Sequence, residues 1–309
     1  MGAGRDDSSV LGLVIPYMIL IDADSLVYAC GFASQTPYSR LVVEDPAGEV
    51  SEASTTNLTD WKREHPGWTI LNREVEVEAQ PEAFAIQALR VALSTIIAKC
   101  GGGKHETFIT GKTNFREQIA TIQPYKGNRD KLHKPVHYGA LRDYLLGAGA
   151  VLVEGMEADD EVSIRAWAAL GKAKRRACIV ASIDKDLDQI PGKHYNPQKD
   201  EFYEVGRLDA DQWFYRQCLT GDSVDNVAGC WRVGPAAADK VLASAYAAGR
   251  RPWDAVLDCY LASALKAGCP YVELGAENAA LENARLVYML HDAKEAEPEN
   301  WWTPEKVNG

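Results

Sequence analysis

One pattern occurs three times in this chain: an apolar run of strand length that leads into closely spaced carboxylates. The three runs and their acidic residues are 18–21 with Asp22 and Asp24, 150–153 with Glu157, Asp159 and Asp160, and 178–183 with Asp184 and Asp186. One such group would be explained by the preference of acidic residues for the first turn of a helix, where the macrodipole is positive. Three groups need another explanation. Because the carboxyl ends of parallel strands meet at one edge of a sheet, we predict that these side chains lie close together.

The order of the other elements supports an α/β fold. Strands are predicted at 17–21, 106–110, 151–153, 178–183, 194–195 and 202–205, and helices at 81–100, 136–146 and 157–170. Strands that alternate with helices predict a mostly parallel, twisted sheet with helices on both faces. Segment 38–80 holds two alternating stretches around a polar middle, which predicts an inserted β-hairpin or lid. Helical spacing dominates afterwards, so we predict an α/β domain at 1–206 and a helical region with a tail at 207–309.

Composition limits the partners of this chain. The net charge of −11 argues against a polyanionic partner for the surface as a whole, but segment 112–142 carries seven Lys and Arg residues against two acidic ones. Seven dispersed cysteines without a Cys-x-x-Cys pair are typical of reduced thiols in the cytoplasm. The longest apolar run, 10–21, contains Pro16 and is too short to span a bilayer. We therefore expect a cytoplasmic protein with no membrane partner, and with local affinity for nucleic acid.

The acidic residues point to a divalent metal ion. Crowded carboxylates destabilise a fold unless cations neutralise them. Oxygen ligands without His or Cys are what Mg²⁺ or Mn²⁺ prefers, and two such ions can support phosphodiester cleavage. A further acidic pair, Asp222 and Asp225, stands in segment 219–229. Gly234 stands before a predicted Ala-rich helix, and the free backbone N–H groups at the start of that helix can bind a phosphate.

Six short segments of this sequence, taken in their order along the chain, form a recognisable pattern. They are 20–29 (LIDADSLVYA), 111–116 (GKTNFR), 124–136 (PYKGNRDKLHKPV), 157–160 (EADD), 182–192 (SIDKDLDQIPG) and 219–229 (LTGDSVDNVAG). Together they resemble the flap endonuclease and 5′→3′ exonuclease family, and are most similar to the compact exonucleases of short-tailed bacteriophages. The resemblance implies a PIN-like (resolvase-like) nuclease domain and a helix-three-turn-helix module that grips duplex DNA.

The resemblance also implies that the protein is a monomeric, metal-dependent 5′→3′ exonuclease. Flap endonuclease activity is a second candidate. Such an enzyme hydrolyses phosphodiester bonds near 5′ ends, nicks or flaps of duplex DNA during phage DNA replication or degradation in the host cytoplasm. RNA primers in RNA·DNA hybrids are a further candidate substrate.

Site residues follow from the same resemblance. Two Mg²⁺ or Mn²⁺ ions would be held by Asp22, Glu157, Asp159, Asp160, Asp184, Asp186, Asp222 and Asp225. The catalytic set would be Asp22, Asp159, Asp160, Asp184 and Lys126, the last at the reacting phosphate. The DNA contacts would be Lys112, Arg116, Tyr125, Lys126, Arg129, Lys131, Lys134 and Gly234. Asp24 is an additional acid that supports the site.

Three features depart from the family pattern. Members often carry an Asp just before the Gly-Lys pair, where this chain has Ile-Thr-Gly at 109–111, so an outer metal ligand is missing or supplied elsewhere. The hairpin usually written Gly-Ile-Gly reads Arg-Val-Gly at 232–234, and the next helix lacks the common lysine. The short span from Arg129 to Glu157 argues against a full threading arch.

Two alternatives stay open at this stage. A haloacid-dehalogenase-type phosphatase would use Asp22 as the nucleophile and Asp24 as the acid/base, with 221–225 as its metal motif. It requires a strand before Gly221, although 211–219 has helical spacing, and it leaves 157–160 unused. The other alternative is a DNA-binding homologue whose catalysis is weakened by the missing Asp near Thr110.

Overall fold

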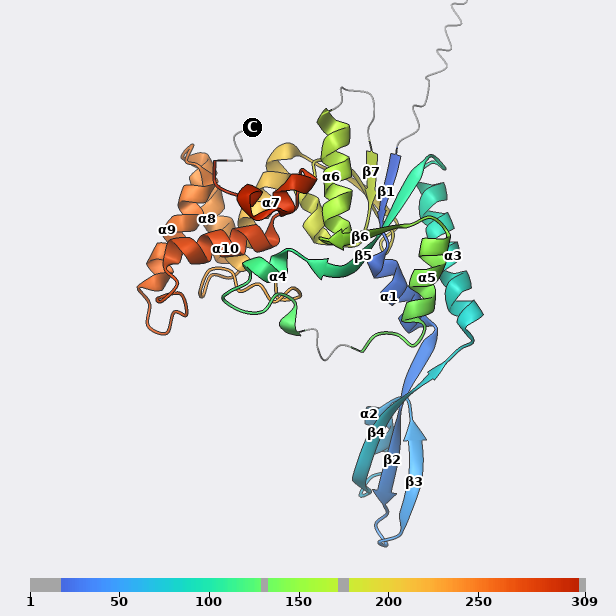
Figure 1. Ribbon diagram of the computed structural model, residues 1–309. Coiled ribbons are helices and arrows are strands. Elements are labelled where there is room, and N and C mark those ends of the chain that lie inside the picture. Colours follow the sequence, from blue (N-terminus) through green and yellow to red (C-terminus); the bar gives the residue numbers. More distant parts are fainter. Residues whose placement is uncertain (1–17, 129–132, 172–177, 306–309) are drawn as a thin grey trace, which may run out of the picture.

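The computed structural model describes residues 18–128, 133–171 and 178–305, and a six-stranded sheet lies at its centre (Figure 1). The strands are β1 (Met18–Asp22), β5 (His105–Asn114), β6 (Val151–Gly155), β7 (Cys178–Ala181), β8 (Gly192–Asn196) and β9 (Glu201–Val205). Their order is β6-β5-β1-β7-β8-β9, and all neighbours are parallel except β8 and β9. The order reverses beside β1, so the carboxyl ends of β1 and β7 flank the crevice where open parallel sheets place their functional groups.

Helices cover both faces of this sheet. They are α1 (Asp24–Ala33), α3 (Glu82–Lys99) and α5 (Tyr138–Gly147) on one face and α6 (Ala158–Gly171) on the other. Successive residues of a strand point to opposite faces. Ile19 and Ile21 of β1 accordingly join the core under α1, α3 and α5, whereas Leu20 joins the core under α6. The predicted α/β class with a mostly parallel, doubly covered sheet is confirmed.

The insertion after α1 is larger than the predicted hairpin. It consists of β2 (Gln35–Glu44), β3 (Val50–Thr55), α2 (Leu58–Glu64) and β4 (Thr69–Ala79). The strands form an antiparallel sheet in the order β3-β2-β4 that projects from the body (Figure 1). Leu41, Val43 and Trp61 are buried in a separate small core. A lone hairpin is marginal in water, and the third strand and the helix supply the burial it lacks.

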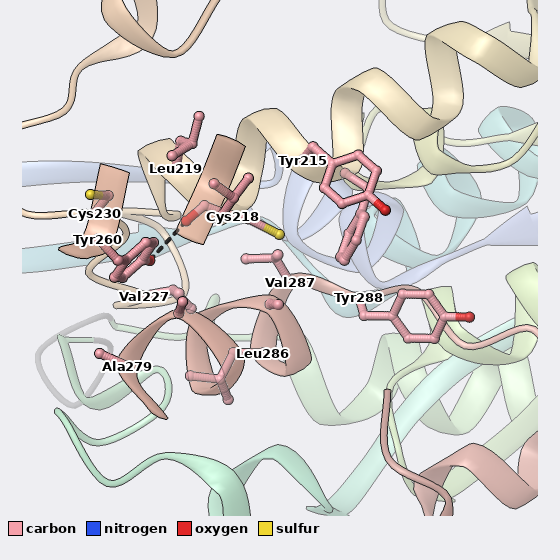
Figure 2. Close-up of a cluster of buried hydrophobic side chains, with 14 of the residues drawn as sticks. Tyr215, Cys218, Leu219, Val227, Cys230, Tyr260, Ala279, Leu286, Val287 and Tyr288 are labelled. Carbon is pink, nitrogen blue, oxygen red and sulfur yellow. Dashed lines mark hydrogen bonds between the residues drawn. The ribbon is translucent and has the colours of Figure 1, made fainter. Parts of the chain in front are cut away.

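The helical region holds the largest core. It contains α7 (Arg207–Thr220), α8 (Pro235–Ala247), α9 (Pro252–Ala264), α10 (Ala276–Val287) and the short turns η3 (Ala293–Ala296) and η4 (Pro298–Asn300). Figure 2 shows α7, α9 and α10 meeting around Leu219, Tyr260 and Val287, with the Tyr260 hydroxyl donating to the Cys218 carbonyl at 2.8 Å. The short helix α4 (Arg116–Ile119), which follows β5, also packs into this core through Ile119. All seven cysteines are free, and no helix in the described part of the chain is long and apolar enough to cross a membrane.

Trp302 anchors the tail to the helical core. Its side chain is 2% exposed, and its ring centroid lies 5.1 Å from that of Phe214 and 5.0 Å from that of Trp253. Replacing Trp302 by Ala should lower the free energy of unfolding by about 3–5 kcal/mol, because a large buried ring leaves a cavity. Urea denaturation measures the loss. Leu265→Ala, at a side chain that is 90% exposed, should cost less than about 0.5 kcal/mol, and equal losses would contradict this account.

Candidate active site

The carboxyl ends of β1 and β7 meet through a serine. The Ser182 hydroxyl donates to Asp22 Oδ2 at 3.1 Å and accepts from the Asp184 backbone N–H at 3.0 Å. Asp22 is buried, and burial together with the charges of Asp24 and Asp184 raises its pKa to about 7. The expectation that Asp22 and Asp184 lie together is met by this geometry. Ser182 was not predicted, although its position between β7 and Asp184 was the available signal.

Thr110 belongs to segment 109–111, where the family pattern leads one to expect an aspartate. Its backbone N–H donates to Asp24 Oδ2 at 3.0 Å, and its hydroxyl accepts from the Ala158 N–H at 2.9 Å, at the start of α6. Its carbonyl accepts from Arg142 at 2.6 Å. Thr110 thus fixes the junction of β5 and α6 with a neutral side chain, which satisfies a helix N-terminal N–H but supplies no charge.

Asp160 and Arg116 form a buried ion pair. The guanidinium group donates to both carboxylate oxygens, at 2.8 Å for Nη2 to Oδ1, and also to the carbonyls of Leu286 and Tyr288. Both side chains are 0% exposed. The structure therefore places Asp160 and Arg116 against each other and outside the lining of the pocket, and their roles as a metal ligand and catalytic residue and as a DNA contact stay predictions. Each carboxylate oxygen is taken by the guanidinium group, which cannot itself reach solvent.

Asp159 and Glu157 have different surroundings, although they flank the same turn. Burial and the charges of Glu157 and Asp160 raise the pKa of Asp159 well above its usual value. Burial would also raise the pKa of Glu157, but the charges of Lys126 and Arg116 outweigh it and lower that pKa. The ammonium group of Lys126 donates to Glu157 and lies 3.5 Å from Asp225 Oδ2. Lys126 is thus the counter-ion of two predicted metal ligands.

Tyr125 is held through its hydroxyl group and Lys126 also through its backbone. The Tyr125 hydroxyl lies 2.7 Å from an oxygen of Glu157 and 2.7 Å from an oxygen of Asp225. Burial raises the pKa of Tyr125 well above its usual range, so the phenol stays protonated. Lys126 has a φ of 55°, a conformation that costs a residue with a Cβ energy and persists only where neighbours enforce it. Its N–H donates to the Asp225 carbonyl at 2.9 Å, which supplies that restraint.

Asp222 and Asp225 lie in a tight loop between α7 and α8. Asp222 pairs with Val227 through two backbone hydrogen bonds, and Asp222 Oδ1 accepts from the Val224 N–H at 2.6 Å. Gly221 has a φ of 64°, and a Cβ there would meet the Val227 carbonyl at 2.2 Å, so only glycine fits. Because α7 runs directly into Gly221, the strand that the phosphatase alternative requires before this motif is absent from this position.

These segments line one pocket of about 790 Å³. Its acidic residues are Asp22, Asp24, Glu117, Glu157, Asp159, Asp184, Asp186, Asp222 and Asp225, and Lys112, Tyr125 and Lys126 also line it. Asp186 follows β7 in the turn η2 (Lys185–Gln189) and accepts from Gln217 at 2.6 Å. Burial and the charges of Asp184 and Asp222 raise the pKa of Asp186 to about 8. Gln217, on the inner face of α7, had no signal in the sequence.

Of the other predicted DNA contacts, two belong to the described part of the chain. Arg129 and Lys131 are outside the described residues. The Lys134 ammonium lies 4.6 Å from the Tyr138 ring centroid, and Gly234 is the N-cap of α8, where its carbonyl accepts from the Ala238 N–H. Neither Lys134 nor Gly234 lines the pocket.

The donor set fits a hard divalent cation. Its side chains are carboxylates, and burial and neighbouring acids raise the pKa values of Asp22 and Asp186, so their ionised forms are disfavoured unless a cation is near. Within the described ranges, no three His, Cys, Asp or Glu side chains converge closely enough to hold one ion. Lys126 binds Glu157 in this arrangement, so ion binding requires side-chain adjustment at the pocket.

The arrangement of this sheet and its helices is shared with solved structures of bacteriophage T5 proteins. The structure is similar to that of a bacteriophage T5 protein co-crystallized with metal ions, with a TM-score of 0.51, 16% identity, and coverage of 88% of this chain and 89% of that one. It is also similar to the bacteriophage T5 flap endonuclease in a pseudo-enzyme-product complex with DNA and metal ions, with a TM-score of 0.51, 16% identity, and coverage of 94% and 96%.

A sequence relative agrees with this fold over part of the chain. DNA polymerase I of Rhizobium leguminosarum is 32% identical over 143 residues, which are 41% of this chain and 14% of the polymerase. This chain therefore matches only a small part of that relative's length. No protein-family model matches the chain.

The raised pKa of Asp22 predicts a pH dependence of stability. Its folded-state pKa of about 7 lies above the ordinary value of 3.8, so between about pH 4 and pH 7 the folded protein binds more protons than the unfolded chain. The free energy of unfolding should fall as pH rises through that window. Asp22→Asn should be more stable than the wild type at pH 8, by up to about 4 kcal/mol at about 1.4 kcal/mol per pKa unit.

Urea denaturation in EDTA at pH 4 and pH 8 measures this difference. The stabilisation should largely disappear near pH 4, where the carboxyl group is protonated in the folded wild type and, with an ordinary pKa of 3.8, about half protonated in the unfolded chain. A variant less stable than the wild type at pH 8 would contradict the assignment of Asp22 as an unneutralised buried acid.

The Asp160–Arg116 pair predicts a stability defect. Asp160→Asn should lower the free energy of unfolding by about 3–5 kcal/mol, because the buried Arg116 guanidinium loses its bidentate partner and keeps only Glu157, 3.7 Å away, as a counter-charge. The double variant Asp160→Leu with Arg116→Met should lose less than this. If Asp160→Asn kept wild-type stability and instead lost affinity for divalent ions, Asp160 would be a metal ligand after all.

Proposed function

We propose that this protein is a divalent-metal-dependent nuclease that hydrolyses phosphodiester bonds near the 5′ ends of duplex DNA. The proposed activity is that of a 5′→3′ exonuclease, with flap endonuclease activity as a second mode. The observation that carries the proposal is the single pocket in which carboxylates from four separate segments surround Lys126 and Tyr125. The fold is shared with a T5 flap endonuclease whose structure holds DNA and metal ions, which supports the same class of chemistry.

Seven carboxylates would hold the metal ions: Asp22, Glu157, Asp159, Asp184, Asp186, Asp222 and Asp225. When bound, Mg²⁺ or Mn²⁺ would neutralise these groups and supply an activated water molecule for attack on phosphorus. The room and the donor set suit two ions. Asp24 would remain a supporting residue, since its oxygens already accept from Thr110 and Arg142.

Lys126 would have the central role among the chain's own groups. Its ammonium group lies at the acidic pocket, beside Glu157 and Asp225. A phosphate group that entered with its metal ions would replace these carboxylates as the partner of Lys126. The lysine would then stabilise the charge that develops on the phosphate oxygens. Tyr125 would keep its proton and orient Glu157.

DNA outside the pocket would be held by the basic tract and the helical region. Lys112 lines the pocket, and Lys134, Arg129 and Lys131 belong to the same tract. This proposal includes a helix-three-turn-helix module at 207–309 that grips duplex DNA, with Gly234 at the start of α8. It also includes a monomeric state, action on RNA·DNA hybrids, and a place in phage DNA replication in a bacterial cytoplasm.

Digestion of labelled substrates tests the proposal. Duplex, nicked, 5′-flap and RNA·DNA hybrid substrates labelled at either end should be cut near the 5′ terminus in Mg²⁺ and not in EDTA. Asp159→Ala should lower the rate about 100-fold or more, because a metal ligand worth several kcal/mol is lost. Asp143→Ala, at an exposed carboxylate on α5, is the matched control and should keep wild-type activity.

Three outcomes would overturn the proposal. Cleavage in EDTA, or full activity of Asp159→Ala, would contradict metal-assisted hydrolysis at this pocket. Rapid turnover of p-nitrophenyl phosphate would favour the phosphatase. Tight DNA binding with no cleavage in Mg²⁺ or Mn²⁺ would identify a DNA-binding homologue that lacks catalysis.

A further inference from the structure

Glu282 on α10 holds the beginning of the loop that carries Tyr125 and Lys126. Its Oε1 accepts from the Thr121 N–H and from the Ile122 N–H, each at 2.8 Å, and its Oε2 accepts from the Thr121 hydroxyl. The side chain is 7% exposed and does not line the pocket. A buried carboxylate with three donors from two consecutive residues fixes the direction in which the chain leaves α4.

The far end of the same loop is tied to the segment of Asp222 and Asp225. The Asn226 amide donates to the Pro124 carbonyl at 2.8 Å, next to the contact between the Lys126 N–H and Asp225. That segment is in turn held by α10, since Asn283 Oδ1 accepts from the Gly229 N–H at 2.7 Å. Consecutive residues of α10, Glu282 and Asn283, therefore anchor both loops that meet at Lys126.

We propose that Glu282 is a positioning residue that sets Tyr125 and Lys126 at the acidic pocket, and this inference rests on the proposed nuclease function. The φ of 55° at Lys126 needs restraint from both sides of the loop. Asp225 supplies one restraint and Glu282 the other. Without Glu282 the N–H groups of Thr121 and Ile122 lose their acceptor, and the loop samples conformations in which Lys126 misses the phosphate.

Hydrogen exchange tests the positioning role without any need for catalysis. In Glu282→Ala the amides of Thr121 and Ile122 should exchange about tenfold faster or more, because their hydrogen bonds are lost. Glu277→Ala, at an exposed carboxylate in the first turn of the same helix, is the matched control and should leave exchange at 120–126 unchanged. Unchanged exchange in Glu282→Ala would overturn the proposal.

Kinetics then separate positioning from general damage. Glu282→Ala should lower kcat about 10- to 100-fold while the Kd for DNA stays within about threefold, since a misplaced group affects the reacting complex more than binding. Glu282→Gln should restore kcat, because its carbonyl accepts from both N–H groups and its amide donates to the Thr121 hydroxyl. In a Lys126→Ala background, Glu282→Ala should have little further effect, because both changes act through one group.

The outcomes are distinguishable from failure of the proposed function. If the wild type cleaves no DNA, the nuclease proposal fails, and hydrogen exchange alone decides whether Glu282 orders the loop. If the wild type cleaves DNA but the losses from Glu282→Ala and Lys126→Ala multiply, Glu282 does not act through Lys126. Failure of Glu282→Gln to restore kcat would also overturn the proposal.

Discussion

The Arg116 guanidinium group joins the central sheet to the helical region. It donates to Asp160 on α6 and also to the carbonyls of Leu286 and Tyr288, at the C-terminal end of α10. Removing two charges from water costs several kcal/mol per ion, so such a pair adds little net stability. Its effect is on position. Asp160 is one residue from Asp159, and the Glu157 N–H also donates to Asp160, at 3.1 Å. The turn that presents two pocket carboxylates is therefore fixed by a contact on its buried side.

The pocket itself is held together against its own electrostatic repulsion. Asp22 and Asp186 keep raised pKa values because both are removed from water by burial and the backbone places them beside other acids. Such strain is typical of functional sites, where stability is lost in exchange for a fixed arrangement of groups. Lys126 relieves part of the repulsion at Glu157 and Asp225, and the loop that carries it is bound to helical residues far away in the sequence.

The fold was predictable from sequence because strand topology leaves few choices. Apolar runs that end in acids, as at Asp22 and Asp184, specify the same edge of a parallel sheet. The neighbours Asp159 and Asp160 could not be told apart, since adjacent helical residues point about 100° apart and only the partner shows which one faces the core. Arg116 looked like one of many basic residues, although its apolar neighbours Phe115 and Ile119 were a usable signal.

The size of the insertion and the contacts of α10 were beyond sequence reasoning for a different reason. In β4, charged residues alternate with valine over 74–78, which indicated an extended stretch but not that β4 is 11 residues long or that β2 pairs with both β3 and β4. Glu282 and Asn283 lie on a helix whose sequence looks like that of many amphipathic helices, and their partners are more than 50 residues away. Only the tertiary structure joins such pairs.

Phe115 and Ile119 come from the sheet half of the sequence, yet they lie in the core built by α7 to α10. A fragment that stopped at residue 206 would leave both side chains in water and the Arg116 guanidinium without the Leu286 and Tyr288 carbonyls. The two halves therefore cannot be exchanged or expressed as independent modules, and the molecule should gain or lose its acidic pocket and its helical framework in the same cooperative event.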